Sequence, residues 1–93
     1  MISVTDKAAG RLKSIKTEVA VDGQVLRLVI QHADGRFDIG LLPDDVRDGD
    51  QIVENEGEQV LLIDGFTSTM LNGAKIDLVD TPEGEQLSLG PDM

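Results

Sequence analysis

The residues with the clearest capacity for chemistry are acidic side chains gathered between residues 44 and 58. Seven carboxylates stand there against the single cation of Arg47. Carboxylate oxygens are ligands for hard cations such as Ca²⁺, and an acidic surface attracts positively charged proteins. The candidates for binding a partner are Asp44, Asp45, Asp48, Asp50 and Glu54, and three of them, Asp44, Asp48 and Asp50, are also candidate metal ligands. A solvated acidic edge that discourages strand-to-strand aggregation is the structural alternative.

Neither of two familiar metal-site patterns is complete. With Gly49 at the glycine position of an EF-hand loop, Val46 and Asn55 stand where an oxygen ligand and a bidentate Glu are required. His32 and Asp34 are further candidate ligands, but an iron site of two histidines and one carboxylate needs a second imidazole, and His32 is the only histidine. A histidine at a hairpin end, in contact with solvent or a nearby carboxylate, is the alternative.

Enzyme chemistry finds little support. Asp77 and Asp80 are interpreted as strand-end and turn residues, because a small β domain offers little space for a cleft that separates two carboxyl pKa values. The sequence has one His, no Cys and no GxGxxG, P-loop or GxSxG motif. We therefore expect no catalytic residue.

The length and composition of the chain exclude several further kinds of function. A chain of 93 residues supports one core, so we expect a single domain over 1–93. A formal net charge of −10 repels nucleic acid and anionic membrane surfaces alike. Without cysteine there is no disulfide, thiolate nucleophile or sulfur-ligated metal. The first ten residues lack the features of a signal peptide, and we expect a cytoplasmic protein.

One helix is expected near the N-terminus. Thr5 is a plausible N-cap, and the apolar positions after it step by four, three and four residues, which places them on one helix face. These positions are Ala8, Leu12, Ile15 and Val19. The basic residues of this helix make it a positive patch on a negative protein.

Short strands account for most of the chain beyond this helix. Val25 to Ile30 is a nearly continuous apolar run that predicts a central strand, and Asp34-Gly35 predicts a type I′ hairpin turn. Further strands are expected at 36–42, which Pro43 closes, at 51–54, at 59–63, near 74–78 and around 87–89, with a short helix at 66–71. The whole predicts a mainly β fold, with α+β as the alternative: a sandwich or pseudo-barrel of six to seven short strands with an N-terminal helix and a short helix before the last two strands.

Three motifs in order resemble a known family. They are the opening Ile2-Ser3-Val4-Thr5-Asp6-Lys7-Ala8-Ala9, the strand Leu26-Arg27-Leu28, and Leu71-Asn72-Gly73-Ala74-Lys75-Ile76-Asp77-Leu78-Val79-Asp80. Together they are similar to the A-type iron–sulfur carriers, the HesB/IscA-like family. The resemblance implies the family's β-rich fold and a setting in iron–sulfur cluster assembly.

The departures fall on the family's three cysteine positions. Where the family reads Gly-Gly-Cys-Ser-Gly, this chain reads Gln31-His32-Ala33-Asp34-Gly35-Arg36, and after a partial match at Gly90-Pro91-Asp92 the sequence stops at Met93, before the other two cysteines. Iron–sulfur clusters need thiolates, which one histidine does not replace. We therefore expect no cluster on the isolated chain.

Three functions remain open on the sequence alone. The first is a non-catalytic member, monomer or homodimer, that binds protein partners in iron–sulfur cluster assembly or sulfur metabolism. The second is an oxygen-ligand module that binds iron or Ca²⁺ through the acidic residues 44–58. In the third, a partner in a heteromeric complex supplies the thiolates.

Overall fold

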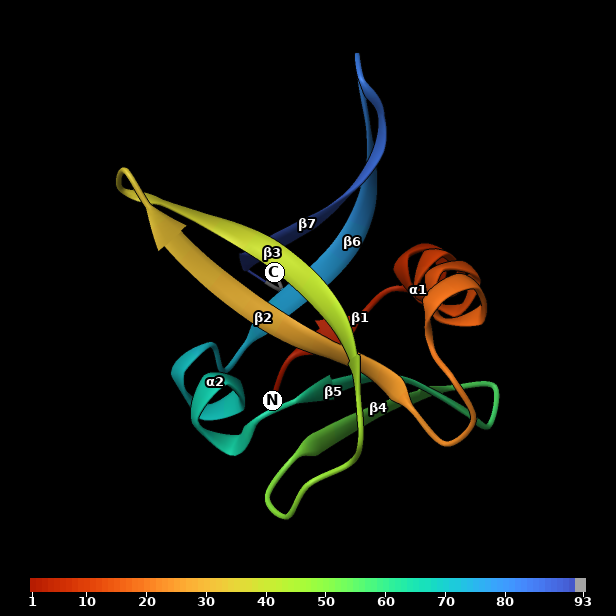
Figure 1. Cartoon of the computed structure of the whole chain (residues 1–93). Helices are drawn as coiled ribbons and strands as arrows, with labels where there is room; N and C mark the ends of the chain where they lie inside the picture. The colour runs from red at the N-terminus through yellow and green to blue at the C-terminus, as the bar shows by residue number, and fades with distance from the viewer. Residues whose placement is uncertain (92–93) are drawn as a thin grey trace.

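The computed structural model describes residues 1–91, with the side chains of all of them except residues 32, 33 and 36–38. Two helices and seven strands follow one another through this range (Figure 1). The elements are β1 (Ser3–Val4), α1 (Asp6–Val19), β2 (Val25–Ala33), β3 (Arg36–Asp44), β4 (Gln51–Asn55), β5 (Glu58–Ile63), α2 (Gly65–Met70), β6 (Ala74–Thr81) and β7 (Gly84–Pro91). The predicted mainly β architecture is confirmed, including the short helix before the last two strands.

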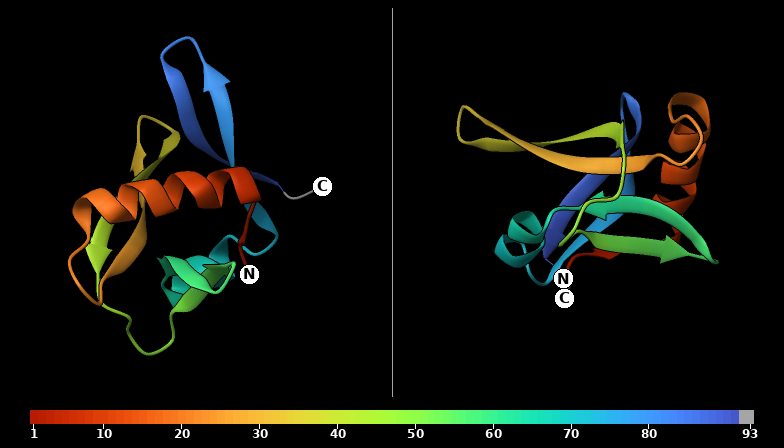
Figure 2. Two further views of the ribbon diagram at one scale, coloured as in Figure 1. Left: turned by 90° about the vertical axis from the view of Figure 1, so that its right-hand side faces the viewer. Right: turned by 60° about the horizontal axis from the view of Figure 1, so that its bottom comes forward.

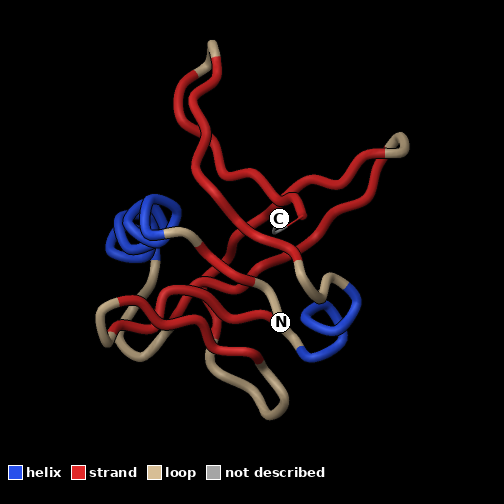
Figure 3. The backbone as a smooth tube through the Cα atoms, turned by 180° about the vertical axis from the view of Figure 1, so that it is seen from behind, coloured by secondary structure: helices blue, strands red, loops and turns tan. Residues whose placement is uncertain are grey.

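The strands form two sheets. One has the order β3-β2-β5-β4 and the other the order β1-β6-β7. Strand β2 lies inside the larger sheet, antiparallel to β3 and parallel to β5, which confirms the central strand expected from its apolar run. The hairpins β2–β3 and β6–β7 extend beyond the body of the molecule as two separate arms, as the views in Figures 2 and 3 show.

Helix α1 lies across both sheets and closes the core. Ala8, Ala9 and Leu12 are fully buried and Ile15 is partly buried, so the predicted apolar face is correct over these turns, whereas Val19 at the helix end is exposed. The helix packs on β2, β5 and β6 (Figure 2). Its partners in the core are Ile2, Leu26, Leu28, Val60, Leu61, Ile63 and Ile76.

The start of α1 is fixed at three points. Thr5 is the N-cap, as predicted, and its Oγ1 accepts a hydrogen bond from the backbone N–H of Ala8 at 3.2 Å. The same hydroxyl donates to Asp77 Oδ1 on β6 at 2.8 Å. The Thr5 N–H donates to the carbonyl of Ile76 at 3.0 Å. The helix is thereby anchored to the smaller sheet at its N-cap.

Two tight turns have the left-handed backbone that a type I′ hairpin requires. Asp34 and Gly35 have φ angles of 53° and 75°, which confirms the predicted turn between β2 and β3. Glu56 and Gly57, at 54° and 81°, make the same kind of turn between β4 and β5. The turns of both hairpins in the larger sheet, β2–β3 and β4–β5, are therefore set by local sequence.

Several boundaries differ from the expectation. Strand β3 continues through Pro43 to Asp44, because it is an edge strand whose outer side needs no N–H donor. The acidic stretch 44–58 is not one loop, since it contains β4 and the turn to β5. Strand β7 is eight residues long rather than a short strand around 87–89, because it pairs with β6 along its whole length.

Neither described helix combines the length and the apolar character that crossing a membrane requires.

Candidate functional site

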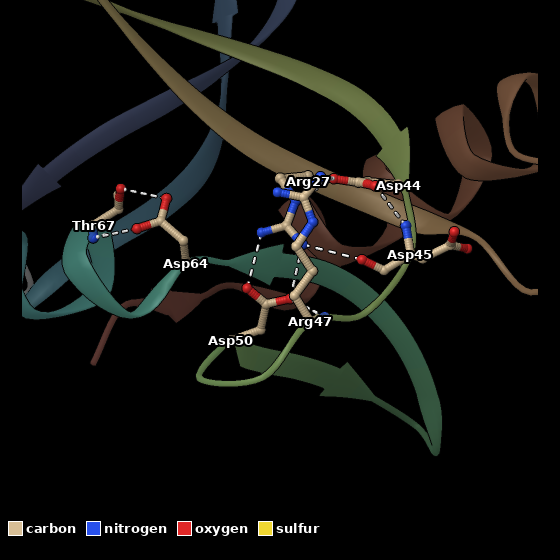
Figure 4. Close-up of polar contacts among 7 residues, drawn as sticks. All are labelled: Arg27, Asp44, Asp45, Arg47, Asp50, Asp64 and Thr67. Atoms are coloured by element: carbon tan, nitrogen blue, oxygen red, sulfur yellow. Dashed lines mark hydrogen bonds and ion pairs between the residues drawn. The ribbon is translucent and has the colours of Figure 1, made fainter.

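Arg27 is the centre of the most elaborate polar cluster in the described part of the chain (Figure 4). It lies on β2, and its side chain is only 9% exposed. The guanidinium donates from Nε to Asp44 Oδ2 at 2.7 Å, and from Nη1 and Nη2 to the two oxygens of Asp50 at 2.9 and 2.8 Å. A further bond runs from Nη2 to the carbonyl of Asp45 at 3.1 Å. The fork geometry of arginine thus satisfies two carboxylates and one carbonyl together.

This cluster holds the segment between β3 and β4 in place. Asp44 Oδ1 accepts the N–H of Asp45 at 2.8 Å, and Asp50 Oδ2 accepts the N–H of Arg47 at 2.7 Å. The guanidinium of Arg47, which is 69% exposed, reaches back to Asp44 at 2.9 Å. Among the described residues no buried side-chain polar atom lacks a hydrogen-bond partner. The segment 45–50 is therefore fastened at both ends to one buried arginine.

The electrostatics follow from these contacts. The hydrogen bond from Arg27 lowers the pKa of Asp50 below the ordinary aspartate value of 3.8, against an opposing effect of burial. The pKa of Asp44 is lowered for the same first reason, with help from the Asp45 N–H. The two carboxylates in turn raise the pKa of Arg27. All three groups are charged at neutral pH.

Sequence reasoning did not single out Arg27. It read the residue as one position in an apolar strand and in the family's Leu-Arg-Leu motif. The available signal was a lone cation within the run Val-Leu-Arg-Leu-Val-Ile, because a charge in a central strand needs a partner. Asp44 and Asp50 follow it by 17 and 23 residues. The pairing of β2 with β3 brings Asp44 to Arg27, and the loop after β3 brings Asp50.

A second part of the acidic stretch is paired with the basic helix. Lys13 donates to Asn55 Oδ1 at 2.9 Å and to Glu56 Oε1 at 3.1 Å. Lys16 donates to the carbonyl of Gln59 at 2.8 Å and lies 3.5 Å from Glu58. The expected positive patch on α1 thus contacts the turn between β4 and β5 within the same molecule.

Three of the predicted partner-binding residues keep open carboxylates. Asp45, Asp48 and Glu54 are exposed, and their side chains make no ion pair or hydrogen bond with another described residue. Asp44 and Asp50 differ, since both are bound by Arg27. Within the predicted set, the structure therefore separates carboxylates with an internal partner from carboxylates open to an external one.

The predicted metal ligands do not form one site, since Asp44 and Asp50 meet only around the guanidinium of Arg27. Asp34 lies in the turn at the far end of the β2–β3 hairpin from Asp44, and the nine residues of β3 span about 30 Å. The side chain of His32 lies outside the described residues. Within residues 1–91, leaving aside the side chains of 32, 33 and 36–38, no group of three or more His, Asp or Glu side chains is positioned to hold a metal ion.

An iron–sulfur cluster also lacks ligands here. Thiolates hold such clusters and the 93-residue sequence has no cysteine. The described residues leave no buried polar side-chain atom unpaired, as a vacant ligand set would. The donor set of this chain therefore does not fit the cluster.

Two further carboxylates have structural partners. Asp64 is the N-cap of α2 and accepts from the N–H and the hydroxyl of Thr67 at 2.8 and 2.9 Å (Figure 4). The Thr67 N–H is the main reason that the pKa of Asp64 is lowered. Asp77 accepts from the Thr5 hydroxyl and from the N–H of Leu78.

Proteins of similar sequence are known. The iron–sulfur cluster insertion protein ErpA of Alkalilimnicola ehrlichii is 35% identical over 85 residues, which cover 89% of this chain and 69% of ErpA. A protein of Aquifex aeolicus is 33% identical over 85% of this chain and 69% of its own length. No family model matches the sequence.

Solved structures share the fold. Escherichia coli SufA, which is involved in the biosynthesis of iron–sulfur clusters, superposes with a TM-score of 0.74 at 16% identity over 97% of this chain and 84% of SufA. IscA, solved with a [2Fe-2S] cluster, gives 0.68 at 18% identity over 98% of this chain and 82% of IscA. The identity to ErpA and its extent, together with this shared fold, show that the chain belongs to the A-type iron–sulfur carrier family, the HesB/IscA-like proteins.

Proposed function

We propose that this chain is a non-catalytic member of its family that acts by binding proteins in iron–sulfur cluster assembly or sulfur metabolism, without carrying a cluster itself. The observation that carries the proposal is a family fold combined with a sequence that has no cysteine. A scaffold that keeps the shape of a carrier keeps surfaces that a carrier's partners recognise.

The position of the first cysteine supports this proposal most directly. The resemblance puts that ligand at Ala33 or Asp34, inside the sequence rather than at its end. Asp34 serves there as the first residue of the type I′ turn, with a φ of 53°. Asp and Asn tolerate this left-handed backbone better than other non-glycine residues. At Asp34, one of these two positions, a turn-forming residue stands in place of a thiolate.

The pKa values of the carboxylates also support a non-catalytic role. Among the described side chains, the carboxylates with shifted pKa values are Asp44, Asp50, Asp64 and Asp77, and each accepts hydrogen bonds from the protein itself. A general acid or base needs a pKa moved toward neutrality, and these four are moved away from it. We further propose that residues 1–93 form one domain, which the core shared by α1 and both sheets supports.

Affinity capture tests the proposal. The chain, immobilised on beads, is incubated with native extract, and the retained proteins are identified by mass spectrometry. An unrelated acidic protein of similar size and net charge serves as the control for capture by charge alone. We expect enrichment of iron–sulfur assembly components, sulfur-transfer proteins or client apoproteins over that control. Their absence from the enriched set would contradict the proposal.

A further inference from the structure

Asn72 and Gly73 lie in the short connection between α2 and β6 (Figure 1). Both residues are exposed, and Gly73 has a φ of 88°. An asparagine followed by glycine loses its side-chain amide readily, because glycine has no side chain that keeps its backbone nitrogen away from the preceding residue. The other asparagine of the chain, Asn55, is followed by Glu56. Asn72 is therefore the one asparagine in the sequence with this reactive neighbour.

The reaction needs only these two residues and water. The backbone nitrogen of Gly73 attacks Cγ of Asn72, the bond from Cγ to Nδ2 breaks, and ammonia leaves with the proton of the Gly73 N–H. The five-membered succinimide then takes up one water. Addition of water at Cγ gives aspartate. Addition at the backbone carbonyl gives isoaspartate, in which the main chain runs through the former side-chain carbon.

Met1 holds both reacting groups in the folded protein. The Gly73 N–H donates to the Met1 carbonyl at 3.2 Å, and the Met1 nitrogen donates to Oδ1 of Asn72. The Gly73 nitrogen must lose its proton to attack, and a hydrogen bond to a carbonyl holds that proton in place. The Met1 contact thus protects the dipeptide.

The contact itself is small. The Met1 side chain is 73% exposed, and the adjoining strand β1 has only two residues. Gln51 holds the next peptide, since its Oε1 accepts from the Ile2 N–H at 3.1 Å and its Nε2 donates to the Ile2 carbonyl at 2.8 Å. Segments with so few contacts open at a lower free energy than the whole fold. Local release of Met1 frees the Gly73 N–H and the Asn72 side chain together.

We propose that Asn72 is a site of spontaneous deamidation whose rate is set by local opening of the Met1 contact. Conversion adds one negative charge at residue 72, and the isoaspartate product lengthens the main chain between α2 and β6 by one carbon. Both products replace the amide group that Met1 contacts. The inference goes beyond the proposed function and does not depend on it, because it concerns the chemistry of the chain alone.

Peptide mapping by mass spectrometry tests the site. The chain is kept at about 37 °C and about pH 8, once folded and once unfolded in urea, and the conversion of each asparagine is followed for about a month. Deamidation changes the peptide mass, whereas isomerisation at an Asp-Gly dipeptide does not. We expect conversion at Asn72 well ahead of Asn55, and at least about tenfold more slowly in the folded chain than in the unfolded one. No conversion of Asn72 in the folded chain, equal rates at the two asparagines, or equal rates with and without urea would overturn the inference.

Asn72→Gln is the matched control for the chemistry. It keeps a side-chain amide at an exposed position but requires a six-membered ring, so we expect no mass gain at residue 72 over the same period. Its amide spectrum verifies the fold. A mass gain at the rate of the wild type would show another reaction and contradict the assignment.

Gln51→Ala tests the protection. The variant loses both hydrogen bonds to Ile2 and should raise the rate at Asn72 several-fold, with an equal rise in hydrogen exchange of the Gly73 amide. Gln51→Glu keeps the acceptor but loses the donor, should give a smaller rise, and decides the question if Gln51→Ala does not fold.

Lys16→Ala is the control for a general loss of stability. It removes a side-chain bond of 2.8 Å to the Gln59 carbonyl, at the side of the molecule away from α2 (Figure 1). We expect it to leave the rate at Asn72 unchanged. An equal acceleration in the Gln51 and Lys16 variants, or none in either Gln51 variant, would overturn the role of the Met1 contact.

Discussion

The contacts of the Arg27 side chain determine the conformation of the loop 45–50. Its guanidinium occupies the carboxylates of Asp44 and Asp50 and thereby sets the course of the loop 45–50. The neighbouring carboxylates of Asp45 and Asp48 are left open on that loop. Sequence reasoning named all four acids as candidates for binding a partner and did not separate those that have a partner within the molecule. Their division into structural and available groups depends on a cation 17 or more residues away, which no local pattern reveals.

Asp50→Asn tests the structural half of this division. The Asp50 side chain is 3% exposed, so the substitution leaves Arg27 buried beside a neutral group and should lower the unfolding free energy by about 3 kcal/mol. Urea unfolding of the wild type and the variant measures the difference. Asp48→Asn, in the same loop but exposed, should change stability by no more than about 0.5 kcal/mol. Equal losses in both variants would remove the distinction between them.

The Arg27 pair also predicts a pH dependence. The folded pKa of Asp50 lies below the ordinary value of 3.8, so its ion pair contributes fully above the unfolded pKa and is lost as pH falls through the folded pKa. The difference in unfolding free energy between the wild type and Asp50→Asn should stay constant from pH 7 to about pH 5 and shrink below about pH 4. Urea unfolding across this range measures it. A difference that grows as pH falls would reverse the predicted sign.

Metal binding is a further test at this scale. Asp44 and Asp50 already bind Arg27, and no metal-binding group is assembled among the described residues. Calorimetric titration with Fe²⁺, Mn²⁺ and Ca²⁺ should therefore give no saturable heat at ion concentrations up to about 1 mM. A saturable signal that Asp45→Asn or Asp48→Asn abolishes would instead support the oxygen-ligand module.

At the scale of elements, local signals predicted turns and caps better than strand lengths. Asp34-Gly35 and the Thr5 cap were both correct, because each depends on a few adjacent residues. Strand β7 was underestimated, since its alternating apolar residues are only Leu87 and Leu89 and the rest of the strand is held by backbone pairing with β6. Periodicity detects burial, and the first three residues of β7 are exposed.

Thr5→Ala tests the coupling between α1 and the smaller sheet. The variant loses the cap on Ala8 and the bond to Asp77, and it should cost about 1 kcal/mol of unfolding free energy. The pKa of Asp77 should rise toward its ordinary value, because the Thr5 hydroxyl is the main cause of its lowering. Urea unfolding and an NMR titration of the carboxyl measure the two effects. Thr17→Ala, at an exposed position within the helix, is the control and should leave the Asp77 pKa unchanged.

At the scale of the whole molecule, the fold class and family were predictable from sequence, whereas the sheet order was not. The parallel pairing of β2 with β5 joins segments more than 30 residues apart, and it depends on how α1 and both sheets share one core. The absence of cysteine was visible from the start, but its meaning came from the family assignment. A carrier fold without thiolates can still present surfaces to protein partners.

Anaerobic reconstitution tests the central claim most directly. The purified chain is incubated with ferrous iron, sulfide and a thiol reductant, desalted under anaerobic conditions, and assayed for visible absorption, iron and acid-labile sulfide. IscA, which has been solved with a [2Fe-2S] cluster, is the positive control in parallel. We predict that IscA retains a cluster whereas this chain retains no stoichiometric iron or sulfide, because it offers no thiolate ligands. A stable, stoichiometric cluster on the isolated chain would contradict the account.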